Sequence, residues 1–389
     1  MTAPQVVGAD AVIHSNLSRV LGMLHRDGPL SRAQLTRQSG LNRSTVGALV
    51  SELSGLGLAY ETEPPAVGRA GRPSPLVHVN EKVAALTINP DVDAVTVGLV
   101  GLGGRVHRRI RYEAATRPSV KETVNISRAI IDGMQGELDG MDRIVGIGAA
   151  VPGLVRSSDG SVLLAPHLEW SDEPFALVLE DALGLPARAG NDATLGCLAE
   201  SIYGAAVGVS DALYLNGSAS GIGGGVISGG RPLRGAAGFA GELGHTLVKS
   251  DGGTCHCGRS GCLDAEVRLE RLLEPLGLKS ADQEELEQAM AERPTPELLR
   301  EIQRQIDLLA VALTNLVNIF NPDMIVLGGF LGALYSQDPD RLASAVAAGT
   351  IGGLGAGVRI RRAVLGSELL LVGAAELAFA ALLANPAGT

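Results

Sequence analysis

The chain has 389 residues, enough for two or three hydrophobic cores, and only 3% of them are aromatic, so we expect aliphatic cores. No basic start followed by an apolar run opens the sequence, and the apolar stretch Leu369–Leu383 is interrupted by Glu376, which favours a packed helix. We therefore expect a cytoplasmic protein with no membrane contact. Residues 1–80 hold seven arginines and five acids, whereas the whole chain carries a net charge of −10, so only the N-terminal part is suited to meet phosphate.

Three short helices are predicted in this N-terminal part. Apolar residues recur at helical spacing from Leu17 to Leu24, before the break at Asp27-Gly28-Pro29. Ser31 is a typical N-cap for a second helix through Ser39, and Gly40 turns the chain. Asn42 caps a third helix whose apolar face consists of Val46, Leu49, Val50 and Leu53.

This pattern predicts a helix-turn-helix over residues 1–80, with Arg43, Ser44 and Thr45 at the start of its second, base-reading helix. Two further segments, Leu58–Glu63 and Pro75–Val79, predict the strands of a wing. Arg69 and Arg72 lie at the wing's tip, where they suit a minor groove or the phosphate backbone. The function predicted is binding of double-stranded DNA. A small helical interaction module is the alternative.

An α/β body follows, because strands and helices alternate beyond residue 80. The predicted strands are Val83–Ile88, Ala94–Val100, Arg105–Tyr112, Ile144–Ala150, Leu213–Leu215, Val226–Ser228 and Met324–Leu327. We expect one helix over Val120–Leu138, two helices over roughly 281–319, and a glycine loop at Ser220–Gly225.

A cysteine cluster with one histidine predicts a structural zinc site. Three of the four cysteines of the chain lie within eight residues, and the candidate ligands are His245, Cys255, Cys257 and Cys262. Three thiolates and an imidazole fill a tetrahedral zinc and leave no position for water, so the metal would stabilise structure without catalysing a reaction. Reduced thiols beside a chance histidine are the alternative. Cys197 stands apart and is expected to be a small buried side chain.

Together these residues resemble the ROK family of repressors, open reading frames and sugar kinases. The segments that carry the resemblance are VPGLV (151–155), APHLEW (165–170), NDAT (191–194), SGIGGG (220–225), LRGAAGFAGELGH (233–245), CHCGRSGC (255–262) and NPDMIVLGG (321–329). The resemblance implies a two-lobed, actin-like ATPase fold, with a sugar between the lobes and a homodimer or homotetramer. The first lobe would be residues 81–190, joined by a C-terminal helix at 367–389, and the second would be residues 191–366 with the zinc loop.

The resemblance also identifies the turn where family kinases hold phosphate with an Asp-x-Gly-Gly-Thr motif. This chain has Asn89-Pro90-Asp91-Val92-Asp93 there. The glycines that let phosphate approach the backbone are replaced, and Asp93 adds negative charge, so we predict that the protein is not an enzyme. A tolerated loop variation in a working kinase is the alternative.

The sugar-binding positions of the family are largely retained. By resemblance the sugar ligands would be Asn191, Asp192, Glu242, His245 and Asp264, with Asp192 at the position of the kinases' catalytic base. His245 would offer one ring nitrogen to zinc and the other to the sugar. Asp264 replaces the usual Glu, and Thr194 and His167 replace the commoner Asn, which favours an unusual sugar or derivative. A helix N-cap for Asp192 and a surface acid for Glu242 are the alternatives.

We therefore predict a sugar-responsive transcriptional regulator, a repressor of carbohydrate-use genes, that binds an inverted-repeat operator as a symmetric oligomer. The first alternative is an ATP-dependent sugar kinase with a fused DNA-binding domain. The second is a family regulator that has lost sugar sensing.

Overall fold

The structure, a computed structural model, describes residues 9–63, 74–281 and 283–388. The chain divides into two compact units. The first unit contains the chain up to Ala149, Pro174–Ala189 and the segment from Ala374 onward, and the second contains Ala150–Glu173 and Gly190–Gly373. Each unit is built around its own five-stranded mixed sheet.

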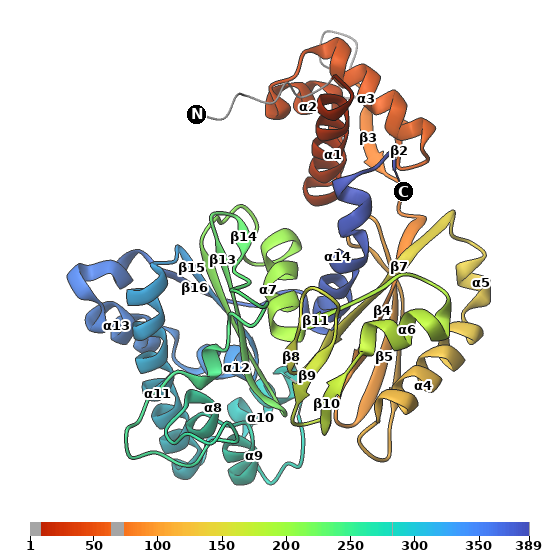
Figure 1. Ribbon diagram of the computed structural model, residues 1–389. Helices are drawn as coiled ribbons and strands as arrows, with labels where there is room; N and C mark the ends of the chain where they lie inside the picture. Colours follow the sequence, from red (N-terminus) through yellow and green to blue (C-terminus); the bar gives the residue numbers. More distant parts are fainter. Residues whose placement is uncertain (1–8, 64–73, 282, 389) are drawn as a thin grey trace, which may run out of the picture. The chain divides into compact units, whose positions relative to one another are not determined.

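The N-terminal module, residues 9–79 of the first unit, combines three helices with a small antiparallel sheet (Figure 1). Its elements are α1 (Ala9–Asp27), β1 (Leu30–Ser31), α2 (Arg32–Ser39), α3 (Arg43–Gly55), β2 (Ala59–Thr62) and β3 (Leu76–Val79). The strand order is β1-β3-β2, so β3 pairs on both sides. Leu21, Leu35 and Leu49, one from each helix, are buried in its core.

Capping residues set the helix ends of this module. The Ser31 hydroxyl accepts a hydrogen bond from the Gln34 backbone N–H at 3.2 Å, and the Gln34 side chain accepts one from the Ser31 N–H at 2.9 Å, which is a capping box. Asn42 Oδ1 accepts from the Thr45 N–H at 2.8 Å. Gly40 ends α2 in the left-handed conformation, which glycine adopts without a steric penalty. The three predicted helices are confirmed.

The body of the first unit is a sheet of order β11-β7-β4-β5-β6. Its elements are β4 (Val83–Pro90), β5 (Ala94–Gly101), β6 (Val106–Glu113), α4 (Val120–Gly133), α5 (Gln135–Leu138), β7 (Arg143–Val151), α6 (Phe175–Leu183) and β11 (Ala187–Asn191). The predicted meander of three strands is confirmed, because β5 pairs antiparallel with both β4 and β6. The predicted single helix over Val120–Leu138 is wrong: the helical backbone breaks at Met134, between Gly133 and Gly136.

The C-terminal helix α14 (Leu369–Ala384) packs against this sheet. A Cβ atom on Gly148 of β7 would overlap the carbonyl oxygen of Ala374, so only glycine permits this approach. Within the described part of the chain, only the segment Gly366–Ala384 is long and apolar enough to cross a membrane, and half of it is buried inside the protein. This burial agrees with the predicted packed helix.

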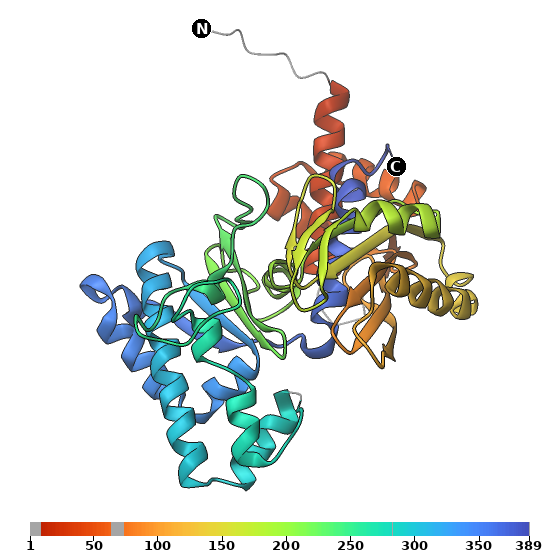
Figure 2. The ribbon, with the colours of Figure 1, turned by 60° about the horizontal axis from the view of Figure 1, so that its bottom comes forward.

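The second unit contains a sheet of order β14-β13-β12-β15-β16 and a small antiparallel sheet of order β10-β9-β8. Its strands are β8 (Leu154–Val155), β9 (Val162–Ala165), β10 (Trp170–Glu173), β12 (Ala212–Ser218), β13 (Gly221–Ser228), β14 (Arg231–Pro232), β15 (Met324–Gly329) and β16 (Arg359–Arg362). Its helices are α7 (Asp192–Tyr203), η1 (Leu243–His245), α8 (Leu263–Glu266), α9 (Glu270–Leu276), α10 (Gln283–Glu292), α11 (Pro296–Phe320), α12 (Phe330–Gln337), α13 (Pro339–Gly349), η2 (Ile351–Gly357) and η3 (Gly366–Glu368). The long helix α11 packs against α13 (Figure 2).

The predicted glycine loop at Ser220–Gly225 is wrong, because most of it forms strand β13, paired antiparallel with β12. The glycines allow close packing on both faces of this strand. A Cβ on Gly225 would lie 2.4 Å from Cys197 Cβ of α7, and a Cβ on Gly224 would lie 2.7 Å from Leu243 Cγ. Tertiary packing therefore overrides the usual weakness of glycine in strands. Cys197 is buried here, as predicted.

The compact units divide the chain differently from the predicted lobes of residues 81–190 and 191–366. Ala150–Glu173 belongs to the second unit, because Asn191 Nδ2 donates to the Gly153 carbonyl at 3.1 Å and Gly238 approaches Ser157 closely. The N-terminal module lies in the same compact unit as the sheet that follows it, and α1 contacts α14 there. A separate domain of residues 1–80 stays a prediction.

Candidate ligand pocket and metal cluster

A cavity of about 290 Å³ lies within the second unit, at the lower end of the size range of small-molecule sites. Its walls come from the loop before β8, the end of β9 with the residues after it, the start of α7, the β12–β13 hairpin, η1 with the residue before it, the cysteine loop (residues 246–262) and the start of α8. The polar residues that line it include all five predicted sugar ligands: Asn191, Asp192, Glu242, His245 and Asp264. Three carboxyl groups thus line one cavity, and each can accept hydrogen bonds.

Asn191 and Asp192 sit at the N-terminus of α7. Asn191 is the N-cap: its Oδ1 accepts from the Thr194 N–H at 2.8 Å. The alternative that Asp192 is the N-cap is therefore wrong. Asp192 occupies the first helical position, where its Oδ1 accepts from its neighbour's N–H at 2.8 Å and from Asn191 Nδ2 at 3.2 Å.

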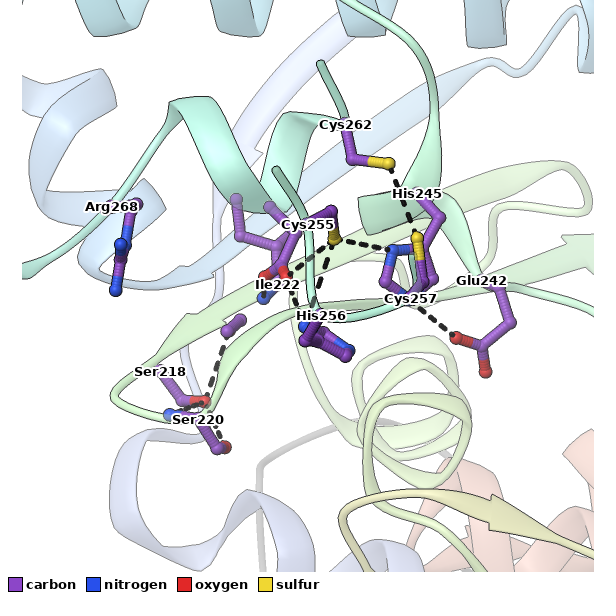
Figure 3. A network of polar contacts seen from close by, with 12 residues as sticks. Ser218, Ser220, Ile222, Glu242, His245, Cys255, His256, Cys257, Cys262 and Arg268 are labelled. Carbon is purple, nitrogen blue, oxygen red and sulfur yellow. Dashed lines mark hydrogen bonds and ion pairs between the residues drawn. The ribbon is translucent and has the colours of Figure 1, made fainter. Parts of the chain in front are cut away.

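The four predicted metal ligands converge. His245, Cys255, Cys257 and Cys262 each offer one ligand atom, and these atoms all lie within 4.8 Å of one another (Figure 3). The Cys257 and Cys262 sulfurs are 3.7 Å apart, and Cys255 Sγ lies 3.6 Å from His245 Nδ1. Ligands bound at about 2.3 Å around a tetrahedral zinc lie about 3.8 Å from each other, so the spacing fits zinc and is too long for a disulfide.

The backbone of the cysteine loop is tightly folded. Cys255 N–H donates to the Arg259 carbonyl at 2.7 Å, and Gly261 N–H donates to the Gly253 carbonyl at 2.9 Å. Gly261 has a φ of +77°, and a Cβ there would collide with the Lys249 carbonyl. Glycine is thus required at the point where the loop brings Cys262 back toward the other sulfurs.

The thiols of this cluster differ in acidity. Burial raises the pKa of Cys255 to about 12 and also raises the pKa of Cys262. A hydrogen bond from the Arg259 backbone lowers the pKa of Cys257. A bound cation would displace the protons from these thiols, so metal affinity falls as the pH falls.

His245 lies between the cluster and the cavity. Its Nδ1 faces Cys255, whereas its Nε2 lies 3.9 Å from Glu242 Oε2 (Figure 3). Burial raises the pKa of Glu242, an effect that His245 and His256 oppose. The Glu242 side chain is nevertheless 47% exposed. The two nitrogens of His245 therefore face the three cysteines on one side and the cavity on the other.

His256 is a residue that the sequence reasoning did not single out. It lines the cavity, and its Nδ1 lies 3.1 Å from Asp264 Oδ2. Its ring meets those of His167 and His245 edge to face, with centroids 5.4 and 5.1 Å away. Its position between two cysteines of the cluster was the available signal that it lies near the predicted site. Asp264 Oδ1 accepts from the Ile222 N–H at 2.7 Å, which fixes the hairpin to the cysteine loop.

Comparison with known proteins identifies the relatives of this chain. The model of the ROK family matches residues 87–381. The chain belongs to the ROK family. The xylose repressor of Caldicellulosiruptor bescii is 29% identical over 331 residues, which are 79% of this chain and 82% of that protein.

Two solved ROK structures resemble the present one. A ROK family transcriptional regulator, described as a homolog of the E. coli MLC protein, has a TM-score of 0.78 at 24% identity and covers 96% of this chain and 97% of its own. The ROK hexokinase of Thermus thermophilus has a TM-score of 0.61 at 29% identity and covers 77% of this chain and 99% of its own. The predicted ROK sugar kinase-like fold, with mixed α/β sheets, is confirmed. Because the ROK family contains both regulators and kinases, membership alone does not decide catalysis.

The turn between β4 and β5 contains Asp91, Val92 and Asp93, which belong to the segment that was predicted to have lost phosphate binding. Asp91 N–H donates to the Ala94 carbonyl at 2.8 Å, and Val92 N–H donates to Asp91 Oδ1 at 2.7 Å. Asp93 pairs with Arg111 at 3.0 Å. Two backbone donors of this turn are thus used within the turn itself.

The predicted DNA-contacting residues lie outside the match to the ROK family model. Arg43 and Ser44 are exposed at the start of α3, and Thr45 is partly buried. The Ser44 hydroxyl donates to Asn42 Oδ1 at 2.7 Å, so the N-cap also orients this side chain. Arg69 and Arg72 lie outside the described residues.

Proposed function

We propose that this ROK protein is a sugar-responsive transcriptional repressor of carbohydrate-use genes. The observation that carries the proposal is the N-terminal module: three capped helices and a small sheet precede the ROK match, in a family whose members include a xylose repressor. The proposal includes a cytoplasmic location and a homodimer or homotetramer that binds an inverted-repeat operator on double-stranded DNA.

The module has the parts of a winged helix-turn-helix. Helices α2 and α3 are joined by the turn at Gly40, and β2 and β3 are the strands of the wing. The exposed N-terminus of α3 would enter the major groove, where Arg43 and Ser44 could meet base edges. Arg69 and Arg72, between the wing strands, would contact the minor groove or phosphate.

The cavity of the second unit would bind the effector, a sugar or sugar derivative. Carboxylates recognise neighbouring hydroxyls in pairs, and Asp192, Glu242 and Asp264 face the same cavity. The Asp264 side chain is only 8% exposed and is already bonded to His256 and the Ile222 N–H, so Asp192 and Glu242 are the stronger candidates for direct contact. The wall of the cavity that carries Asp264 also carries His256.

We expect Asp192→Asn to weaken sugar binding about 10- to 100-fold, because a charge-assisted hydrogen bond contributes about 1.5–3 kcal/mol. Calorimetric titration with a panel of sugars identifies the effector and measures the loss. Asp340→Asn is the matched control, since Asp340 is an exposed acid in the first turn of α13, outside the cavity. Unchanged affinity in Asp192→Asn would remove Asp192 from the site.

We further propose that the protein is not a kinase. Two backbone donors of the β4–β5 turn are engaged within it, and the turn carries two carboxylates, one of them paired with Arg111, where the family resemblance expects phosphate-binding glycines. With ATP and magnesium in excess, a coupled assay on every sugar that binds should detect no phosphorylated product above a protein-free blank. Phosphorylation that disappears in Asp192→Asn would instead establish the kinase alternative.

The cofactor proposal is a structural zinc held by His245, Cys255, Cys257 and Cys262. The spacing of the four ligand atoms and the chemistry of three thiols with one imidazole support it. Bound there, the metal would fix the loop that carries His256 and Asp264 and would orient His245 toward the cavity.

A further inference from the structure

Helix α1 of the N-terminal module makes a buried polar contact with α14. His25 Nε2 lies 2.9 Å from Glu376 Oε1, and the two residues are 1% and 8% exposed. The Phe379 ring, one turn further along α14, meets the His25 ring edge to face at 5.5 Å. A polar pair so far from solvent is costly unless its hydrogen bonds are satisfied, so it specifies one arrangement of the two helices.

The hydrogen bonds define the proton on His25. The Gly103 backbone N–H, in the turn after β5, donates to His25 Nδ1 at 2.9 Å. Because Nδ1 accepts, it carries no proton, and Nε2 must carry the proton that it donates to Glu376. One imidazole therefore joins three elements: α1, the β5–β6 turn and α14.

A second polar contact joins α1 and α14, two helical turns away from the His25–Glu376 pair. The Ser18 hydroxyl donates to the Leu383 carbonyl. Ser18 precedes His25 by seven residues on α1, and Leu383 follows Glu376 by seven residues on α14. The two helices therefore run antiparallel in a fixed register along this seam.

Helix α14 also reaches the ligand-binding unit. Its first residues, up to Gly373, belong to the second unit, whereas Glu376 belongs to the first. A Cβ on Gly373 would lie 2.4 Å from the Leu195 carbonyl of α7, so α14 and α7 are in close contact there. The N-terminus of α7 carries Asp192 in the cavity. Helix α14 thus contacts the helix of the candidate sugar site within the second unit and the first helix of the N-terminal module within the first unit.

We propose that α14 transmits sugar occupancy from α7 to the N-terminal module, and that His25 and Glu376 are the positioning residues of this coupling. The inference rests on the proposed function. A ligand that favours one position of α7 would bias α14, and the polar pair would pass that bias to α1 because its bonds tolerate only one register. Neither residue would touch sugar or DNA.

Two substitutions at Glu376, one double variant and one control test the coupling. Each full-length protein is titrated with operator DNA in the presence and absence of the sugar found by calorimetry. Sugar responses in such proteins change affinity about 5- to 150-fold. Glu376→Leu should bring the ratio of the two DNA dissociation constants to within about twofold of one, while sugar affinity stays within about threefold of wild type. Glu376→Gln should keep the ratio, because its amide oxygen can accept the Nε2 proton.

Glu368→Leu is the control, since Glu368 is an exposed acid just before α14. Should Glu376→Leu unfold, the double variant His25→Leu/Glu376→Leu replaces the pair with apolar side chains and should also respond weakly to sugar. A normal sugar response in either leucine variant, or equal loss in Glu376→Gln, would overturn the coupling role.

If the proposed sugar response itself is wrong, the same titrations give a result that differs from failure of the coupling. A wild-type protein that binds operator but responds to no sugar would refute sugar sensing. In that case hydrogen exchange still tests the seam: faster exchange of α1 amides in Glu376→Leu than in Glu376→Gln supports a positioning contact, and equal exchange rejects it.

Discussion

Loss of metal from the Cys3His cluster should unfold the cysteine loop and abolish sugar binding. We expect freshly purified, reduced protein to contain one zinc per chain, and Cys257→Ser to lose it. Structural zinc contributes about 10–16 kcal/mol of binding free energy in small zinc domains, so the effect on this loop should be the largest of any single substitution. Metal analysis, thermal unfolding and sugar titration measure the three consequences.

The control is Cys197→Ala, which changes the cysteine outside the cluster and should leave the zinc content unchanged. A chelator applied to the wild type should reproduce the Cys257→Ser result, and added zinc should reverse it. Protein that lacks zinc but binds sugar with full affinity would contradict the structural role of the cluster.

Replacement of Arg43 should greatly weaken operator recognition. Its side chain is exposed at the first position of α3, and a good base contact contributes about 1–3 kcal/mol of discrimination. Arg43→Ala should therefore lower operator affinity about 5- to 150-fold and affinity for unrelated DNA much less. The operator is obtained by selection from random DNA, and fluorescence anisotropy at fixed salt measures both affinities.

Arg300→Ala removes another exposed charge, from α11 outside the N-terminal module, and should leave operator affinity unchanged. Arg72→Ala should weaken operator and unrelated DNA alike and flatten the salt dependence, as loss of a phosphate contact does. A selected operator without two-fold symmetry would contradict the symmetric oligomer, and a normal specificity ratio in Arg43→Ala would contradict the proposed docking of α3.

Local signals in the sequence predicted the parts of this protein whose structure depends on near neighbours. Ser31 and Asn42 begin helices because their side chains bond to backbone three residues away. The cysteine cluster was predictable for the same reason, since three of its four ligands lie within eight residues. Glu242 and Asp192 were placed at one cavity only through the family resemblance.

Features that depend on distant partners could not be predicted from the sequence. The bond between His25 and Glu376 joins residues 351 positions apart, and the sequence marks Glu376 merely as an interruption of an apolar run. The glycine segment was interpreted as a loop because glycine is rare in strands, yet packing of α7 and Leu243 on both of its faces makes it a strand. His256 contacts Asp264 eight residues later, which no periodic pattern signals.

The glycines of β13 restrict how this protein can acquire a new effector. Gly223, Gly224 and Gly225 each admit only a hydrogen atom, because a methyl group at any of them would meet a neighbour at 2.7 Å or less. Gly223 also lines the cavity, so this part of the cavity wall cannot be remodelled by adding side chains without displacing α7 or η1. We expect selectivity to diversify instead at other residues that line the cavity, such as His167 and His256. A library built for biosensor design should vary those walls and leave β13 intact.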